Sequence, residues 1–269
     1  MCIRDSTFIV KSEDLMHFLC VKLKSIRFVL LMILVAVLLA VSINGVASAQ
    51  VFFGYSTKRV PIYSVDTENK QVAISFDAAW GADKTADIVE TLKEYNVGAT
   101  FFLVGFWVDK NADMVELIDE SGFEIGNHSS THPDLTTVSA EKLENELSHC
   151  SELIKGITGK DVALFRAPYG AYNNTVLDTA TKLGMQTIQW DVDSLDWKGL
   201  SAQEITIRIL NNVKNGSIIL CHNNSDHILD ALPMVLDRLQ KQGYTITSIG
   251  DLVYKENYTI DRNGLQKLS

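Results

Sequence analysis

Short apolar runs alternate with longer amphipathic stretches along the chain from residue 58 onward. The apolar runs are typical of buried strands, and the stretches between them repeat apolar residues at helical spacing. Predicted strands cover residues 72–76, 99–103, 123–126, 163–165, 186–190, 217–220 and 244–247. Predicted helices cover residues 84–95, 112–121, 139–157, 173–183, 202–213 and 229–242. A strand followed by a helix, repeated about seven times, indicates an α/β fold with a parallel sheet, open or closed, and helices outside it.

Helix starts and uninterrupted patterning define the predicted domain. Ser139 and Ser201 each precede an amphipathic run, where a hydroxyl can cap the helix, and Glu204 stands three residues after Ser201. The sequence shows no linker rich in Pro, Gly or Ser and no internal repeat in this region. We therefore predict one domain over residues 58–254 and a C-terminal tail over residues 255–269.

A stretch without any charge, residues 28–49, follows Lys22, Lys24 and Arg27. Its apolar core and the small-x-small ending at residues 47–49 are typical of a secretory signal peptide. The stretch is also long enough to span a bilayer of about 30 Å, so an uncleaved membrane anchor is the alternative. Either reading predicts that the domain lies outside the cytoplasm, secreted or membrane-anchored.

The remaining N-terminal residues add little to the fold prediction. Residues 1–6 resemble a translated sequencing adapter, Met16 is a candidate true start, and residues 1–27 are interpreted as an artefactual start plus a basic region. Residues 50–57 are interpreted as a linker. Cys150 and Cys221 remain in the domain, where a single disulfide is possible but two cysteines are a weak signal for one, and no cysteine cluster indicates a metal site.

Composition excludes several protein classes. Hydrophobic residues make up 46% of the chain and charged residues 21%, with 4 Pro and 16 Gly, which excludes disordered and collagen-like proteins. The net charge of -9 and the absence of a Lys/Arg cluster exclude nucleic acid as an expected partner. A length of 269 residues fits one barrel plus an export segment, and we expect a monomer.

Chemically capable side chains follow the predicted strands at their carboxyl ends. In barrels and open parallel sheets, the loops at this edge converge on one mouth, so these side chains predict a functional site. They are Asp77, His128, His132, Arg166, Asp191, Asp193, Asp196 and His222.

The spacing of the two histidines suggests a metal site. His128 and His132 are four residues apart, which would put both imidazoles on one side of a helical turn, although two surface histidines are an equal alternative. Asp77 is the nearest candidate for a third ligand. Arg166 stands beside a rigid turn, where a structural ion pair is the alternative.

A second group of residues suits a sugar. Asp193 and Asp196 stand beside the indole of Trp197, and a flat apolar ring fits a sugar face, although a lone Trp more often serves packing. His222 ends an apolar strand, where a core histidine would be the default interpretation.

Together these motifs resemble, in order, those of the polysaccharide deacetylase family, also called the NodB homology domain or carbohydrate esterase family 4. The matching motifs are H-S-x-x-H at 128–132, R-x-P-Y-G at 166–170, D-x-x-D-W at 193–197 and L-x-H at 220–222. The form F-D-x-x-W-G at 76–81 is similar to sporulation-associated members from spore-forming bacteria. The resemblance implies a deformed (β/α) barrel with about seven strands.

The resemblance also implies an activity, the metal-dependent removal of N-acetyl groups from peptidoglycan amino sugars by hydrolysis of a linear amide C–N bond. Asp77 would be the catalytic base, held anionic by Arg166. His222 would be the acid that protonates the departing amine, held charged by Asp196. The products would be acetate and a free amino sugar.

The implied ligands and substrate contacts complete this expectation. His128 and His132 would hold a divalent ion, zinc first and cobalt or manganese as alternatives. Tyr169, Trp197 and Asp193 would bind the polysaccharide substrate, and the backbone N–H of Tyr169 would stabilise the oxyanion.

The first motif departs from the family pattern. Most members read T-F-D-D-G, whereas this chain has Ser75-Phe76-Asp77-Ala78-Ala79, and Ala78 cannot bind a metal. The ion could be held by the two histidines with added water, or with a carboxylate from Asp77 or Asp83. Otherwise the site is catalytically silent, and the protein binds glycan or belongs to the spore envelope. The four retained motifs favour activity.

Overall fold

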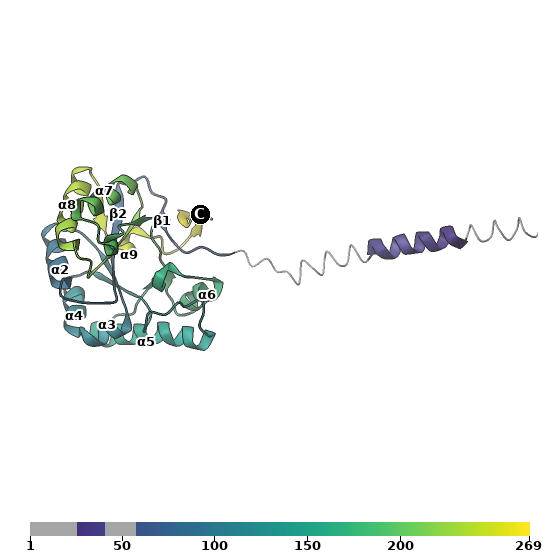
Figure 1. Cartoon of the computed structure of the whole chain (residues 1–269), viewed down its shortest axis with the longest axis horizontal. Helices are drawn as coiled ribbons and strands as arrows, with labels where there is room; N and C mark the ends of the chain where they lie inside the picture. The colour runs from purple at the N-terminus through teal and green to yellow at the C-terminus, as the bar shows by residue number, and fades with distance from the viewer. Residues whose placement is uncertain (1–25, 41–57) are drawn as a thin grey trace, which may run out of the picture. The chain divides into compact units, whose positions relative to one another are not determined.

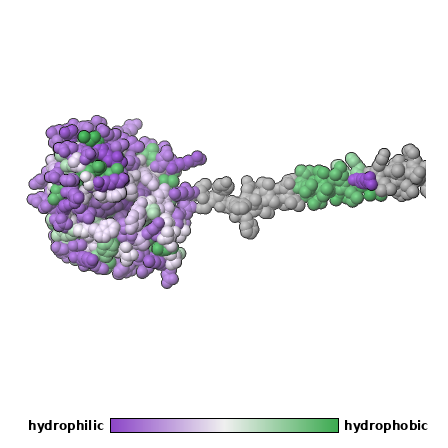
Figure 2. All heavy atoms as spheres, viewed as in Figure 1, coloured by the Kyte–Doolittle hydropathy of each residue, from purple (hydrophilic) through white to green (hydrophobic). Residues whose placement is uncertain are grey.

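The computed structural model describes residues 26–40 and 58–269, which belong to two separate compact units. Residues 26–40 form one helix whose large apolar side chains are exposed, giving an almost continuous hydrophobic surface (Figure 2). Within the described ranges, no helix has both the length and the apolar character needed to cross a membrane. The rest of the predicted signal or anchor, residues 41–49, lies outside the described residues, as do the predicted linker 50–57 and residues 1–25.

A parallel sheet forms the centre of the unit 58–269. Its strands follow the order β6-β5-β4-β3-β2-β8-β7, and β9 also pairs with β2. The pairs within this sheet are parallel. The strands are β2 (Gln71–Ala78), β3 (Thr100–Leu103), β4 (Glu124–Asn127), β5 (Leu164–Phe165), β6 (Gln186–Thr187), β7 (Val192–Asp193), β8 (Ile218–His222) and β9 (Thr245–Thr247).

Helices cover the outside of this curled sheet (Figure 1). They are α2 (Thr85–Glu94), α3 (Gly105–Lys110), α4 (Ala112–Glu120), α5 (Ala140–Thr158), α6 (Asn174–Lys182), α7 (Ala202–Asn212) and α8 (Ile228–Lys241). The short helix α9 (Ile249–Leu252) packs instead with Ala73 and Phe102 on the other face of the sheet. The arrangement confirms the predicted α/β class and deformed barrel. The predicted strands and helices are all present, and the short elements α3, α9 and β7 were not predicted.

Side chains on the two faces of the central strand β2 pack in two different cores. Successive side chains of a strand point to opposite faces. Ala73 packs with Phe102 in a smaller core, and Ser75 and Asp77 share its face because they follow it by two and four residues. The strand therefore carries a carboxylate onto the face of the smaller core. The side chains of the other face pack in the large core beneath the helices, namely Val72, Ile74, Phe76 and Ala78.

Helix caps agree with the sequence pattern. The Ser139 hydroxyl accepts the N–H of Lys142, and Ser201 forms a complete capping box with Glu204. Cys150 and Cys221 are buried and unpaired, so no disulfide joins them.

The C-terminal residues differ from the expected tail. Residues 255–269 contain β10 (Tyr258–Ile260) and β11 (Leu265–Leu268), and β11 pairs in parallel with β1 (Ser64–Val65). The fully buried Gln266 exchanges hydrogen bonds with the backbone of Tyr254, which fixes these residues to the domain. The compact unit therefore runs to Ser269. Because β11 and β1 pair across about two hundred residues, no local pattern in the sequence indicates these strands.

Candidate active site

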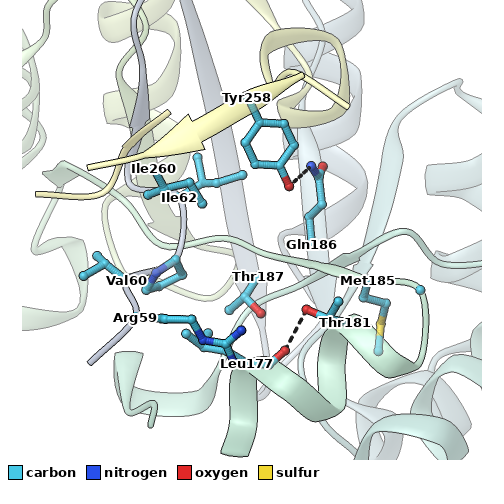
Figure 3. Close-up of a pocket in the computed structure, with 12 residues that line it drawn as sticks. Arg59, Val60, Ile62, Leu177, Thr181, Met185, Gln186, Thr187, Tyr258 and Ile260 are labelled. Atoms are coloured by element: carbon cyan, nitrogen blue, oxygen red, sulfur yellow. Dashed lines mark hydrogen bonds between the residues drawn. The ribbon is translucent and has the colours of Figure 1, made fainter. Parts of the chain in front are cut away.

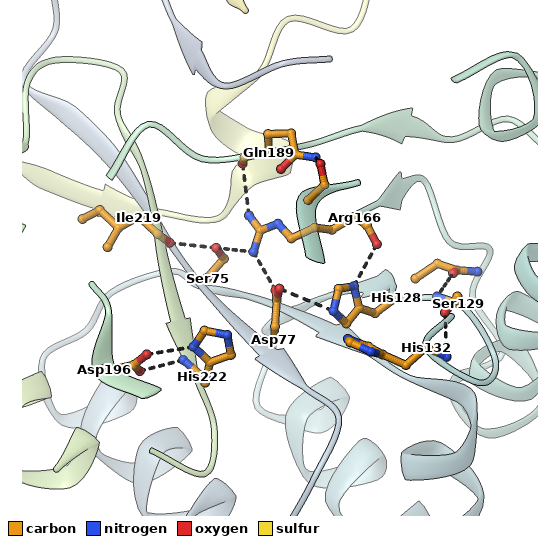
Figure 4. Close-up of polar contacts among 12 residues, drawn as sticks. Ser75, Asp77, His128, Ser129, His132, Arg166, Gln189, Asp196, Ile219 and His222 are labelled. Carbon is orange, nitrogen blue, oxygen red and sulfur yellow. Dashed lines mark hydrogen bonds and ion pairs between the residues drawn. The ribbon is translucent and has the colours of Figure 1, made fainter. Parts of the chain in front are cut away.

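The predicted catalytic and metal-binding residues meet at the carboxyl edge of the sheet (Figure 4). Asp77 lies near the end of β2 and is the register partner of His222, the last residue of β8. His128 directly follows β4, and Arg166 directly follows β5. The predicted convergence of strand ends therefore brings these four side chains together.

A buried ion pair fixes the Asp77 carboxylate. Arg166 Nη1 donates to Asp77 Oδ1 at 2.7 Å and to Ser75 Oγ at 2.9 Å. Arg166 Nη2 donates to the carbonyl of Gln189 at 3.2 Å, and the guanidinium lies 4.1 Å from the ring centre of Phe102. Arg166 is completely buried and the Asp77 side chain is 8% exposed, so neither charge is screened by bulk water.

The surroundings keep Asp77 ionised. Burial alone would raise its pKa, but the opposing charge of Arg166 lowers it, with further lowering from His128 and His222. The net pKa of Asp77 lies below its ordinary value, because the Arg166 cation and its hydrogen bond stabilise the carboxylate. An anionic carboxylate with one oxygen free of the guanidinium can accept a proton.

The two histidines meet in a loop, and the predicted helical turn is wrong. Ser129 and His132 have φ values of 66° and 58°, a left-handed conformation that no helix contains. Asn127 Oδ1 accepts the N–H of Ser129, and Ser129 Oγ accepts the N–H of His132. These bonds fold the loop back so that the rings of His128 and His132 lie 5.0 Å apart.

Both imidazoles are suited to metal binding. Burial lowers the pKa of His128 and lowers that of His132 to about 4, so both are neutral at pH 7. His128 Nδ1 lies 2.8 Å from the carbonyl of Arg166, which fixes the proton there and leaves Nε2 free, 3.5 Å from Asp77 Oδ2. His132 Nδ1 is buried without a hydrogen-bond partner.

The donor types at this place, two histidines and a carboxylate, would suit a divalent ion. Two neutral imidazoles and the Asp77 Oδ2 atom are the ligand types that zinc accepts. Among residues 26–40 and 58–269, no three His, Cys, Asp or Glu side chains lie close enough to form a complete ligand group. Ala78 is fully buried in the helix-side core, and Asp83 is exposed in the turn before α2 with its carboxylate against Gly81.

A second ion pair orients His222. Its Nδ1 lies 2.7 Å from Asp196 Oδ1, and its backbone N–H donates to Asp196 Oδ2 at 2.8 Å. Burial lowers the pKa of His222. The hydrogen bond to Asp196 and the charge of Asp196 raise this pKa by more than burial lowers it, so the net pKa is above its ordinary value. With Nδ1 bonded to Asp196, Nε2 is the nitrogen that can donate a proton to a substrate.

The three predicted substrate-binding residues differ in their surroundings. Tyr169 has a φ of 60°, is 70% exposed, and places its ring 4.6 Å from that of His132 in an edge contact. Trp197 is 60% exposed and directly follows Asp196. The Asp193 carboxylate accepts the N–H of Leu195, so its visible role is to shape this loop.

Some contributing residues were not predicted. Ser75 holds the Arg166 guanidinium and donates to the carbonyl of Ile219, and its position two residues before Asp77 was the signal for a shared face. Asp191, in contrast, binds Ser217 and the backbone N–H of Ile218, outside the catalytic group.

A separate cavity of about 350 Å³ lies beside α6, β6 and β10 (Figure 3). Its lining includes Arg59, Met185 and Tyr258, and none of the predicted site residues lines it. The cavity is therefore distinct from the catalytic group.

Comparisons with known proteins agree with this geometry. The family model described as polysaccharide deacetylase matches residues 64–188. A peptidoglycan-N-acetylmuramic acid deacetylase of Bacillus subtilis is 34% identical over 72% of this chain and 75% of the relative. A peptidoglycan-N-acetylglucosamine deacetylase of Listeria monocytogenes is 34% identical over 79% of this chain, which spans 45% of that protein.

A solved structure with the same fold is a wild-type pseudoenzyme of carbohydrate esterase family 4 from Bacillus anthracis. It matches with a TM-score of 0.70 at 33% identity, covering 72% of this chain and 68% of that chain. A mutant of that pseudoenzyme with restored enzymatic activity also has a TM-score of 0.70, at 35% identity over 72% of this chain and 71% of that chain. The motifs, the fold and the relatives agree, and this chain belongs to the polysaccharide deacetylase family.

Proposed function

We propose that this protein is an extracytoplasmic, metal-dependent hydrolase that removes N-acetyl groups from peptidoglycan-type glycan in a spore-forming bacterium. The observation that carries this proposal is the pair of register partners Asp77 and His222, whose pKa values are shifted in opposite directions. A carboxylate that stays anionic and an imidazole that stays protonated are what amide hydrolysis needs. The names of the B. subtilis and L. monocytogenes relatives support the glycan as substrate.

Asp77 begins the reaction as the general base. Its carboxylate takes a proton from the water that attacks the acetamide carbonyl. Arg166 keeps the carboxylate anionic and fixes its direction through the 2.7 Å hydrogen bond. The backbone N–H of Tyr169 would donate to the developing oxyanion.

His222 completes the reaction as the general acid. Its Nε2 donates a proton to the amine as the C–N bond breaks, and Asp196 stabilises the charged imidazole before that step. The exposed side chains of Tyr169 and Trp197 would form aromatic walls for the sugar, and Asp193 would contribute a carboxylate. Acetate and the free amino sugar then leave.

His128 and His132 would hold the divalent ion, with Asp77 Oδ2 beside them. Zinc suits this donor set best, and cobalt and manganese are the alternatives. When bound, the ion supplies Lewis-acid polarisation of the amide and lowers the pKa of water.

A catalytically silent, glycan-binding protein of the cell wall or spore envelope is the second candidate. Ala78 stands where most members of the family have a metal-binding Asp, and the B. anthracis structure with the same fold is a pseudoenzyme. This candidate would bind glycan through the exposed aromatic side chains Tyr169 and Trp197 without turnover.

Acetate release from the purified full chain separates the two candidates. The substrates are glycans rich in N-acetylglucosamine and in N-acetylmuramic acid, each with EDTA or with added zinc, cobalt or manganese. We expect release that EDTA abolishes and one of the metals restores. No release under any of these conditions would refute the hydrolase and favour the silent protein.

A further inference from the structure

Trp80 is an exposed indole directly after a buried stretch of chain. Ala78 and Ala79 before it are 0% and 6% exposed, whereas Trp80 is 57% exposed. Its ring meets that of His132 edge-on, with 5.0 Å between the ring centres, and lies 6.5 Å from that of Phe106. The catalytic steps described above do not use this side chain.

Two buried side chains fix the backbone next to Trp80. The carbonyl of Gly81 accepts a hydrogen bond from Trp107 Nε1 at 2.7 Å and another from Asn223 Nδ2 at 2.8 Å. Trp107 and Asn223 are each 1% exposed, and Gly81 has a φ of 65°, which favours glycine. The indole is therefore exposed to solvent on a backbone that the core holds in place.

An exposed indole on a fixed backbone is preorganised to bind the apolar face of a ligand. A Trp side chain that packs inside the protein hides a large apolar area, whereas Trp80 leaves more than half of its surface in water. Because the backbone is already fixed, little conformational entropy would be lost when a ligand covers the ring.

We propose that Trp80 binds the sugar that adjoins the deacetylated one, by stacking its indole on the apolar face of a pyranose ring. This inference rests on the proposed function, since it assumes that a glycan occupies the site. Trp80 contacts His132, which contacts His128, which in turn lies beside Asp77. The rings of His132 and His128 thus lie between Trp80 and Asp77. The reacting acetamide would lie at Asp77, so Trp80 is placed to contact the next sugar. The preferred substrate is therefore a polymer with at least one further sugar.

The test compares a β-1,4-linked N-acetylglucosamine tetramer with the N-acetylglucosamine monomer. Binding is measured by calorimetry, and turnover by acetate release, for the full chain and for Trp80→Ala and Trp80→Phe. Ile207→Ala is the matched control, because Ile207 on the outer helix α7 is also 57% exposed. Circular dichroism and the Tm establish that each variant is folded.

We expect Trp80→Ala to weaken tetramer binding and raise the tetramer KM about tenfold, the size of a lost aromatic contact. The kcat and the monomer affinity should stay unchanged, Trp80→Phe should recover part of the binding, and Ile207→Ala should have no effect.

Other results would overturn the inference. Equal tetramer affinity in the wild-type and Trp80→Ala proteins would do so, as would no tetramer binding by the wild type. A fall in kcat at constant KM would show instead that Trp80 only supports His132. Tetramer binding that depends on Trp80 in a protein that releases no acetate would refute the proposed hydrolysis and still support the sugar-binding role.

Discussion

Two ion pairs at the carboxyl edge of the sheet differ in their access to water. Arg166 and Asp77 are 0% and 8% exposed, so this pair is closed to solvent. In the second pair, Asp196 is completely buried but the His222 side chain is 27% exposed. One pair is thus a fixed arrangement of charges, whereas the other can exchange a proton with solvent.

The difference in solvent exposure fits the different roles proposed for the two pairs, one for the general base and one for the general acid. Arginine stays charged at ordinary pH, so its charge holds the pKa of the Asp77 carboxyl below the usual range. An imidazole must lose its proton and regain it in each cycle, and the exposure of His222 permits that exchange. In the proposed mechanism, the neighbouring strands would thus place a base that stays anionic beside an acid that can regain its proton.

Removing the fixed charge should have the largest effect. We expect Asp77→Asn to lower kcat by about 10³-fold, because the general base is lost. It should also lower the free energy of unfolding by about 3 kcal/mol, because the buried Arg166 loses its counter-charge. Acetate release and urea denaturation measure the two effects. Asp191→Asn is the control, since this carboxylate lies outside the catalytic group and its loss should leave kcat unchanged.

Removing the exchangeable acid should affect turnover without affecting the fold. We expect His222→Gln to lower kcat by about 10²-fold, because the leaving amine is no longer protonated. Stability should change by less than about 1 kcal/mol, since the side chain is partly exposed and the backbone bond to Asp196 remains. His227→Gln, at the exposed start of α8, is the control. Normal turnover by His222→Gln would exclude His222 as the acid.

The pH dependence should separate the two pairs further. Because Asp196 raises the pKa of His222, Asp196→Asn should move the alkaline limb of the kcat/KM profile to lower pH. The ion pair should stabilise the fold most below about pH 6.5, the pKa of an unfolded histidine, and this contribution should disappear as pH rises through the higher folded value. Denaturation of both proteins across this range measures the stability difference. An unchanged alkaline limb would show that another group controls it.

The sequence predicted these pairs better than it predicted the loops between them. Asp77, Arg166 and His222 end apolar runs, and the rule that parallel strands end at one edge was enough to bring them together. His132 was placed on a helical turn because its spacing from His128 fits one. Its left-handed φ depends on side-chain bonds to the loop backbone, which spacing alone does not show.

Trp80 shows the same limit of sequence reasoning. The sequence motif that contains Trp80 was identified, but the sequence alone predicted no role for this side chain. The role becomes visible only when Trp107 and Asn223, which are distant in sequence, are found on the carbonyl of Gly81.

Placing a carboxylate at position 78 would test whether this position can help to hold the proposed metal. Ala78 is 0% exposed, so we expect Ala78→Asp to lower the Tm in EDTA, because burying a charge without a partner is costly. If the new carboxylate at position 78 reaches the ion from the end of β2, zinc should recover the Tm and bind more tightly than to the wild type. The kcat should stay within about threefold, because the two histidines would already hold the ion. Ala73→Asp, four residues before Asp77 on the same face of β2 and away from the carboxyl edge, should lose stability without any recovery by zinc. Equal zinc affinity of the wild-type and Ala78→Asp proteins would show that position 78 does not reach the metal.

The smallest effect should come from a change that leaves both ion pairs intact. Trp107→Phe keeps an aromatic ring in the core but removes the Nε1–H that holds the carbonyl of Gly81 at 2.7 Å. The loss of one buried hydrogen bond costs about 1 kcal/mol, and the loop that carries Trp80 becomes freer to move. We therefore expect the tetramer KM to rise about threefold at unchanged kcat. Ile118→Val in α4 should cost similar stability through the same core without touching Gly81, so its KM should stay constant. If both variants raised KM equally, general softening of the core would explain the effect, and the hydrogen bond to Gly81 would have no separate part in presenting Trp80 to the glycan.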